Sequence, residues 1–154
     1  MFGMWLYLTA KLSVHLSQEC DPQRIKKLAE IRKAKDPQHP GCVVYSVGSN
    51  GDYTFELGLQ KEVGEGVCEF HIFDMGDYKE HRPKELKGRV YYHRWGLKKQ
   101  GAAAPAHWNK KAGEINKFLG LKDTIRELGH EHLGVIDIFV SIKLLSLHGV
   151  CFHI

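Results

Sequence analysis

The sequence predicts an α/β fold with a mostly parallel sheet and helices on both of its faces. Two apolar and β-branched runs, Cys42–Val47 and Val67–Phe73, flank the glycine-containing segment Gly48–Asp52 and a segment of helical periodicity. Short continuous apolar runs are typical of strands that are buried on both faces. Strand, glycine loop, helix and strand in this order form a βαβ unit, in which the two strands are parallel.

The length and composition correspond to one domain. The chain has 154 residues, 43% of them hydrophobic, which is enough for one sizeable core but not for two full domains. Its formal net charge of +4 is a mild excess that permits a nucleic-acid partner without implying one. The four cysteines form no C-x-x-C pair, and we interpret Cys42 and Cys68 as plain core residues.

Residues 1–40 are predicted to form an N-terminal helical segment. Four apolar residues recur at helical spacing near its start: Trp5, Leu8, Leu12 and Leu16. This run is shorter than the roughly 20 apolar residues of a membrane span, so we expect no span in this chain and a cytoplasmic protein. Asp21 and Pro22 are typical of a helix start. The helix that follows would have an apolar side made of Ile25, Leu28 and Ile31.

Residues 41–139 contain the other predicted elements. The helix after the glycine loop has its apolar face at i, i+4 and i+8: Phe55, Leu59 and Val63. The alternation in Arg89–Trp95 predicts a third strand. Lys117–Leu128 has helical periodicity and ends at Gly129, and the apolar run at 134–142 predicts a fourth strand.

The loop Gly48–Asp52 gives the first indication of chemistry. Glycines remove the Cβ atoms that would keep a ligand from the backbone, and they permit positive φ. The N-terminus of the following helix presents free N–H groups and a partial positive charge. Such a loop can receive a carboxylate or a phosphate, although G-x-x-G alone is also common in ordinary turns.

Asp74 ends the second predicted strand. In a dinucleotide or nucleoside site an acid at this place accepts hydrogen bonds from the ribose hydroxyls. The alternative is an aspartate that only caps the turn Met75–Asp77. Together, loop and acid predict a nucleoside-cofactor site, and the missing third glycine of G-x-G-x-x-G argues against a nicotinamide or flavin cofactor.

Four segments resemble motifs of FkbM-like and methyltransferase-like proteins, which bind S-adenosylmethionine (SAM): VVYSVGSNGDYTFE, CEFHIFD, HRWGL and LKDTIRELGHEHLGVIDIF. The resemblance covers about Cys42–Phe139. It implies a Rossmann-like SAM-methyltransferase fold with SAM as cofactor. It further implies methyl transfer to an oxygen of a small molecule or sugar.

The resemblance also implies which residues bind SAM. The glycine loop would approach the methionine part, and the strand-end acid would take the ribose. These cofactor-binding residues are Gly48, Ser49, Asn50, Gly51, Asp52 and Asp74. Ser46 stands where many relatives have an acid. Trp95 and Gly96 fall where relatives contact the adenine or shape the pocket, and a buried core tryptophan is an equal alternative.

The resemblance stops after Phe139. Relatives continue with Lys-Ile-Asp-x-Glu, whose acids line the active site, whereas this chain reads Val140-Ser141-Ile142-Lys143. We therefore expect residues 140–154 to be a divergent apolar tail and the C-terminal part of the fold to be missing. No catalytic residue is predicted.

The leading hypothesis is a SAM-dependent methyltransferase domain that acts on a small-molecule acceptor. One alternative is a catalytically inactive fragment with a partial SAM site. A weaker alternative is an RNA-binding module that uses the basic and aromatic residues of Arg89–Lys99. The histidines around His130–His132 fit no zinc pattern, so we expect an exposed loop there and no metal. The sequence does not predict the oligomeric state.

Overall fold

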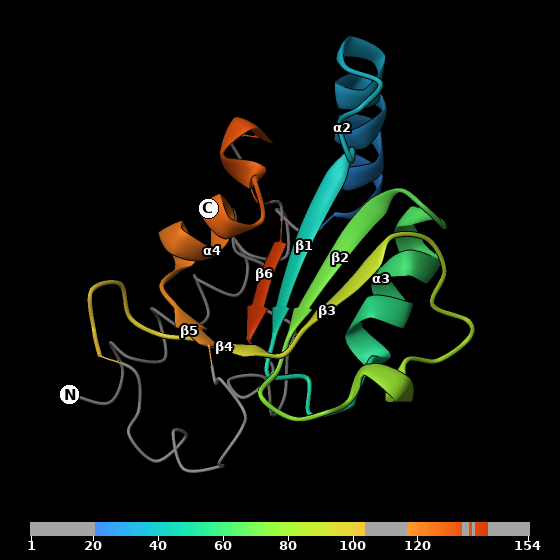
Figure 1. Cartoon of the computed structure of the whole chain (residues 1–154). Coiled ribbons are helices and arrows are strands. Elements are labelled where there is room, and N and C mark those ends of the chain that lie inside the picture. Colours follow the sequence, from blue (N-terminus) through green and yellow to red (C-terminus); the bar gives the residue numbers. More distant parts are fainter. Residues whose placement is uncertain (1–20, 104–116, 134–135, 137, 142–154) are drawn as a thin grey trace, which may run out of the picture.

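A parallel four-stranded sheet forms the centre of the molecule (Figure 1). The structure, a computed structural model, describes residues 21–103, 117–133, 136 and 138–141. The strands follow one another across the sheet in the order β3 (Val90–His93), β2 (Cys68–Phe73), β1 (Cys42–Val47) and β6 (Ile138–Ser141). All neighbouring strands are parallel. This arrangement confirms the predicted α/β fold with a parallel sheet.

Helices cover both faces of the sheet. The helices α2 (Pro22–Lys35) and α3 (Thr54–Val63) contribute Ile25, Ala29 and Val63 to one core, which also contains Val44 and Ile72 of the sheet. The other core holds side chains from α4 (Leu121–Glu127), the 3₁₀ helix η3 (His130–Leu133) and the opposite face of β1 and β2. Figure 1 shows α3 and α4 on opposite sides of the sheet.

The central strands are apolar on both faces because each face is covered. Val43 and Tyr45 of β1 belong to the core beside α4, and Val44 belongs to the core beside α2 and α3. Successive side chains of a strand point to opposite faces. A strand buried on both faces therefore has a continuous apolar run, and Cys42–Val47 is found as β1 with the predicted bounds.

Cys42 and Cys68 form a disulfide, so their interpretation as plain core residues is wrong. They are register partners on the parallel strands β1 and β2, and their Cα atoms are 4.4 Å apart. This separation is within the range that a disulfide spans. The pairing depends on strand register, which the spacing of the cysteines in the sequence does not reveal.

Helix α2 begins as predicted. The carboxylate of Asp21 accepts a hydrogen bond from the N–H of Gln23 at 3.0 Å, and Pro22 is the first helical residue. Ile25 and Ala29 are buried, but Ile31 is 43% exposed, so its place on the apolar side is wrong. Six residues after Ile25, a helix has turned by about 240°, which carries Ile31 away from the buried stripe.

Two of the predicted elements are divided in the structure. The expected strand Arg89–Trp95 ends at His93, and a separate strand β4 (Trp95–Leu97) pairs with β5 (Lys117–Leu119) in a small parallel sheet. The expected helix Lys117–Leu128 therefore begins with a strand, and α4 starts only after Gly120. Pairing with β4 overrides the helical periodicity of its first residues.

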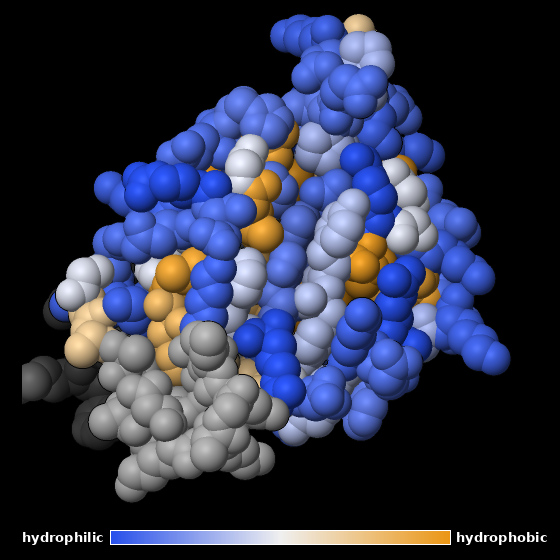
Figure 2. Space-filling model, in the orientation of Figure 1, coloured by the Kyte–Doolittle hydropathy of each residue, from blue (hydrophilic) through white to orange (hydrophobic). Residues whose placement is uncertain are grey.

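The face of the molecule in Figure 2 is mostly hydrophilic, and its hydrophobic residues lie in strips between hydrophilic ones. Among the described residues, no helix combines the length and apolar character of a membrane span. The predicted first helix near Trp5–Leu16 and residues 104–116 lie outside the described residues. Of the expected tail at 140–154, Val140 and Ser141 form the end of β6, and the rest lies outside the described residues.

Candidate cofactor site

The loop Gly48–Asp52 lies at the carboxyl end of β1 and leads into α3. The N–H of Gly48 donates to the carbonyl oxygen of Phe73 at 2.8 Å, so the loop starts beside the end of β2. Gly48, Asn50 and Gly51 have φ angles of 73°, 51° and 80°. Positive φ favours glycine, and a Cβ on Gly51 would lie only 2.9 Å from Nδ1 of His81. The glycines are therefore required by the path of this loop.

Asp74 joins this loop to the turn after β2. Its Oδ2 accepts a hydrogen bond from the N–H of Asn50 at 2.7 Å, and its Oδ1 accepts one from the N–H of Gly76 at 2.8 Å. The structure thus brings together the two features that the sequence predicts as a site. It also shows the turn-capping contact that was the alternative. A carboxylate has about four lone-pair sites, so the cap leaves acceptor capacity for ligand hydroxyls.

Asp52 serves the start of α3. Its Oδ1 accepts from the N–H of Thr54 at 2.8 Å and from the Thr54 hydroxyl. These hydrogen bonds, first that of the hydroxyl and then that of the backbone, lower the pKa of Asp52. The carboxylate therefore satisfies the free N–H of Thr54, the first residue of α3. Its contact with a cofactor stays a prediction.

Three tyrosine hydroxyls hold the segment after β2 against the glycine loop. Tyr78 donates to the side-chain oxygen of Asn50 at 2.8 Å, and Tyr53 donates to the carbonyl oxygen of Tyr78 at 2.9 Å. Tyr92 donates to the carbonyl oxygen of Gly76 at 2.9 Å. Burial raises the pKa of Tyr92 to about 12, so this phenol stays protonated. No local motif in the sequence identifies these tyrosines, since each acts across separate segments.

Buried polar atoms without partners surround the start of the loop. Within the described residues, no hydrogen bond of ordinary geometry reaches the hydroxyls of Ser46 and Ser49 or the carboxyl oxygens of Glu56. Each of the three residues is at most 1% exposed. Unpaired buried polar groups are rare and call for an explanation. A ligand at this loop would supply partners to groups such as the Ser49 hydroxyl, so the residues present fit a polar cofactor.

A buried acid, Glu56, lies beside Ser46, the position at which the resemblance led us to expect an acid. Burial raises the pKa of Glu56, and the hydroxyl of Ser46 lies near enough to lower it in part. Glu56 belongs to the first turn of α3, so this helix places a buried carboxyl group beside Ser46 of β1. No local pattern in the sequence indicates this contact, because the helix must pack on the strand before the two side chains meet.

A family model described as a methyltransferase domain matches residues 17–144. The chain belongs to this methyltransferase-domain family. The match includes the glycine loop, Asp74 and all the described strands. It confirms the resemblance to methyltransferases, and the parallel sheet has the form of a Rossmann-like methyltransferase fold. No curated protein and no solved structure matches the chain significantly.

Trp95 and Gly96 of the methyltransferase domain lie after β3 and are packed against protein side chains. The Trp95 ring stacks on His93 with centroids 4.6 Å apart, and Nζ of Lys117 lies 4.5 Å from its centroid. The indole N–H is buried and has no hydrogen-bond partner within the described residues. A Cβ on Gly96 would lie 2.5 Å from the Phe118 ring. Both residues therefore have a packing role, and their contact with adenine stays a prediction.

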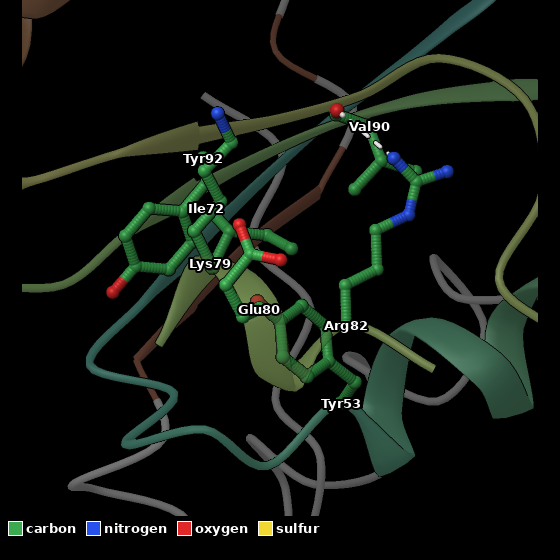
Figure 3. A pocket seen from close by; sticks show the side chains of 7 residues that line it. All are labelled: Tyr53, Ile72, Lys79, Glu80, Arg82, Val90 and Tyr92. Atoms are coloured by element: carbon green, nitrogen blue, oxygen red, sulfur yellow. Dashed lines mark hydrogen bonds between the residues drawn. The ribbon is translucent and has the colours of Figure 1, made fainter. Parts of the chain in front are cut away.

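A cavity of about 260 Å³ lies on the α3 side of the methyltransferase domain. Figure 3 shows the side chains around it: Tyr53, Ile72, Lys79, Glu80, Arg82, Val90 and Tyr92. The Arg82 guanidinium donates to the carbonyl oxygens of Leu86 and Val90. None of the predicted cofactor residues lines this cavity, so it is distinct from the loop and Asp74.

The weaker RNA-binding alternative rests on residues that make internal contacts. Arg89 donates to the carbonyl oxygen of Pro40 and pairs with Glu69. Tyr91 is 44% exposed, but its ring stacks on His71. The predicted strand with one buried face explains this stretch, and no contact in it favours a nucleic-acid ligand over packing.

His130 corrects the expectation of an exposed histidine loop. Only 9% of His130 is exposed, and its Nδ1 lies 2.7 Å from the Tyr45 hydroxyl. Burial, followed by the neighbouring charge of His71, lowers the pKa of His130 to about 4. Glu131 and His132 are exposed, as expected. The 3₁₀ helix η3 has about three residues per turn, so His130 and Leu133 face the core while Glu131 and His132 face outward. Three adjacent polar residues in a sequence do not reveal which one is buried.

Proposed function

We propose that this methyltransferase domain binds SAM through Gly48–Asp52 and Asp74 and transfers its methyl group to a small-molecule acceptor. The hydrogen bond between Asn50 and Asp74, 2.7 Å long, is the observation that carries the proposal. It holds the loop after β1 and the acid after β2 side by side at the carboxyl ends of parallel strands. Ligands of open α/β sheets bind at such ends.

Different residues of the site would bind different parts of the cofactor. The backbone N–H groups of the loop and the N-terminus of α3 suit the carboxylate of the methionine part. The Asp74 carboxylate suits the ribose hydroxyls, and the buried Ser49 hydroxyl lacks a partner among the described residues. SAM, when bound, supplies a methyl group on a positively charged sulfur. The protein contributes chiefly by aligning the acceptor with that methyl group.

The acceptor is proposed as an oxygen of a sugar or another small molecule. This finer statement rests on the resemblance to FkbM-like proteins, and membership of the methyltransferase family supports methyl transfer in general. A non-catalytic role is the second candidate. It is favoured by the end of β6, where Ser141 pairs with Val47 beside the loop and the acids of relatives are replaced.

Calorimetric titration of the full chain with SAM tests the site. Wild type should bind SAM, and Asp74→Ala should weaken binding by at least about tenfold, since a charge-assisted hydrogen bond contributes about 1.5–3 kcal/mol. Asp77→Ala is the matched control, because Asp77 is an exposed acid in the same turn. Absence of SAM binding, or equal weakening by both changes, would refute the site.

Transfer of labelled methyl groups separates the two candidates. Purified chain and labelled SAM are incubated with pools of sugars and of other hydroxyl-bearing small molecules. Labelled product that is lost with Asp74→Ala supports the enzyme. SAM binding without labelled product from any pool supports the non-catalytic candidate.

The sequence analysis expects a cytoplasmic protein, and the Cys42–Cys68 disulfide opposes this expectation. Disulfides persist in oxidising compartments and are rare in the cytosol. We propose an oxidising compartment on this ground.

A further inference from the structure

A cluster of an acid and histidines lies on the side of the sheet away from α3. Glu69 and His71 are two residues apart on β2, so their side chains point to the same face. His130 reaches them from η3. The three residues are 8%, 4% and 9% exposed. This cluster belongs neither to the proposed SAM site nor to the cavity on the α3 side.

The three side chains present ligand atoms to one point. One carboxylate oxygen and one nitrogen from each histidine all lie within 4.8 Å of one another. Nε2 of His71 is 2.8 Å from Oε1 of Glu69, and Nε2 of His130 is 3.7 Å from the same oxygen. Tetrahedral zinc with bonds of about 2.0–2.2 Å holds its ligand atoms about 3.4 Å apart. Side-chain shifts of less than about 1 Å therefore suffice to enclose an ion.

Both histidines have a partner on the second ring nitrogen. Nδ1 of His71 lies 2.9 Å from Nε2 of His93, and Nδ1 of His130 lies 2.7 Å from the Tyr45 hydroxyl. Metal-binding histidines are usually held in this way, because the outer partner fixes the tautomer and the ring orientation. With Nδ1 protonated, each ring would donate to its outer partner and direct the Nε2 lone pair to the ion.

Glu69 is held in the same manner. Its second oxygen, Oε2, lies 3.2 Å from the guanidinium of Arg89, while Oε1 faces the two histidines. The 3.7 Å between Oε1 and His130 is too long for a hydrogen bond. The hydrogen-bond network therefore joins Glu69 to His71 and stops short of His130, and an ion would close this gap.

We propose that Glu69, His71 and His130 bind one divalent transition-metal ion of the zinc class, which fixes η3 to the sheet. Two imidazoles and one carboxylate suit zinc and its neighbours, whereas magnesium and calcium prefer oxygen ligands. The ligands come from β2 and from η3, which are distant in the sequence, so the ion would act as a structural link. Water can fill the fourth position. The proposal does not depend on SAM binding.

Zinc titration of the metal-free full chain tests this site. Bound zinc is measured by competition with a chromophoric chelator and by elemental analysis. Wild type should bind one ion that His130→Gln weakens by at least about 100-fold, since a ligand should matter no less than an outer partner. His132→Gln is the matched control, because His132 lies exposed on the same 3₁₀ helix.

A second variant keeps the test valid if His130→Gln fails to fold. Tyr45→Phe retains all three ligands and removes the hydroxyl beside His130, and it should weaken zinc binding by about 10- to 100-fold. Cobalt in place of zinc should show the intense visible absorption of a tetrahedral site in wild type and in His132→Gln. Wild type without tight zinc binding would overturn the proposal. Unchanged affinity in Tyr45→Phe, or equal losses in His130→Gln and His132→Gln, would overturn it too.

Discussion

At the scale of single residues, Glu56 is an unusual group, because it is a fully buried acid. Its side chain is completely buried, and its carboxyl oxygens have no hydrogen-bond partner of ordinary geometry within the described residues. Burial raises the pKa of Glu56, because an apolar environment disfavours the charged form. A buried acid of this kind lowers stability at neutral pH.

Replacing Glu56 by glutamine should therefore stabilise the chain at pH 7. An acid whose pKa is raised by folding binds more protons in the folded state, so stability falls as pH rises above the unfolded pKa of about 4.3. Glu56→Gln should raise the free energy of unfolding by about 1–3 kcal/mol at pH 7. The gain should vanish below about pH 4. Urea unfolding at several pH values measures this dependence.

Glu62→Gln provides the control on the same helix, because Glu62 is exposed. It should change stability by less than about 0.5 kcal/mol at every pH. A pH-independent effect of Glu56→Gln, or a loss of stability at pH 7, would contradict the account of a buried and poorly paired acid.

At the scale of elements, the glycines predicted to form a loop between β1 and α3 are found there with positive φ angles. The loop leaves β1 with positive φ at three of its residues and passes under Tyr78 and His81. At Gly51 a Cβ would lie 2.9 Å from Nδ1 of His81, and the φ of 80° is one that other residues rarely adopt. The loop and the segment after β2 therefore form one packed unit.

Gly51→Ala should destabilise the chain by about 1–3 kcal/mol through the strained φ of 80° and the contact with His81. Gly58→Ala is a control of opposite sign. Gly58 lies in α3, and a Cβ there meets nothing within 4 Å. Alanine in a helix interior is favoured over glycine by about 0.5–1 kcal/mol. Thermal unfolding measures the stability of both variants. Equal effects of the two substitutions would contradict the statement that the loop conformation requires glycine at position 51.

The elements predicted from the sequence are those that local pattern and burial specify together. The strands β1 and β2 have continuous apolar runs because both faces are covered, and α2 and α3 are recognisable from spacing. The strands β4 and β5 were not predicted as a pair, because each has three residues and is defined by its partner. The same distinction applies to individual residues. Gly48–Asp52 and Asp74 are recognisable from the local sequence, whereas the contacts of Glu56, Tyr78 and His130 depend on the tertiary fold.

At the scale of the whole molecule, β1 and β2 connect the two cores. Cys42, Val44 and Ile72 lie in the core beside α2 and α3, while Tyr45 and Phe73 lie in the core beside α4. Movement of one strand relative to the other would therefore disturb both faces. The disulfide between Cys42 and Cys68 fixes this pair at its amino end, opposite to the loop and Asp74.

Removal of this disulfide should lower the stability of the whole domain. Closing a loop of 26 residues restricts the unfolded chain, an effect of about 3.5 kcal/mol in the loop-entropy model. A double variant with Cys42→Ala and Cys68→Ala should lose about this amount in urea unfolding. A reductant should destabilise wild type but leave the double variant unchanged. Peptide mass spectrometry without reduction should recover the two cysteines linked, and full alkylation of both in the folded oxidised protein would contradict the bond.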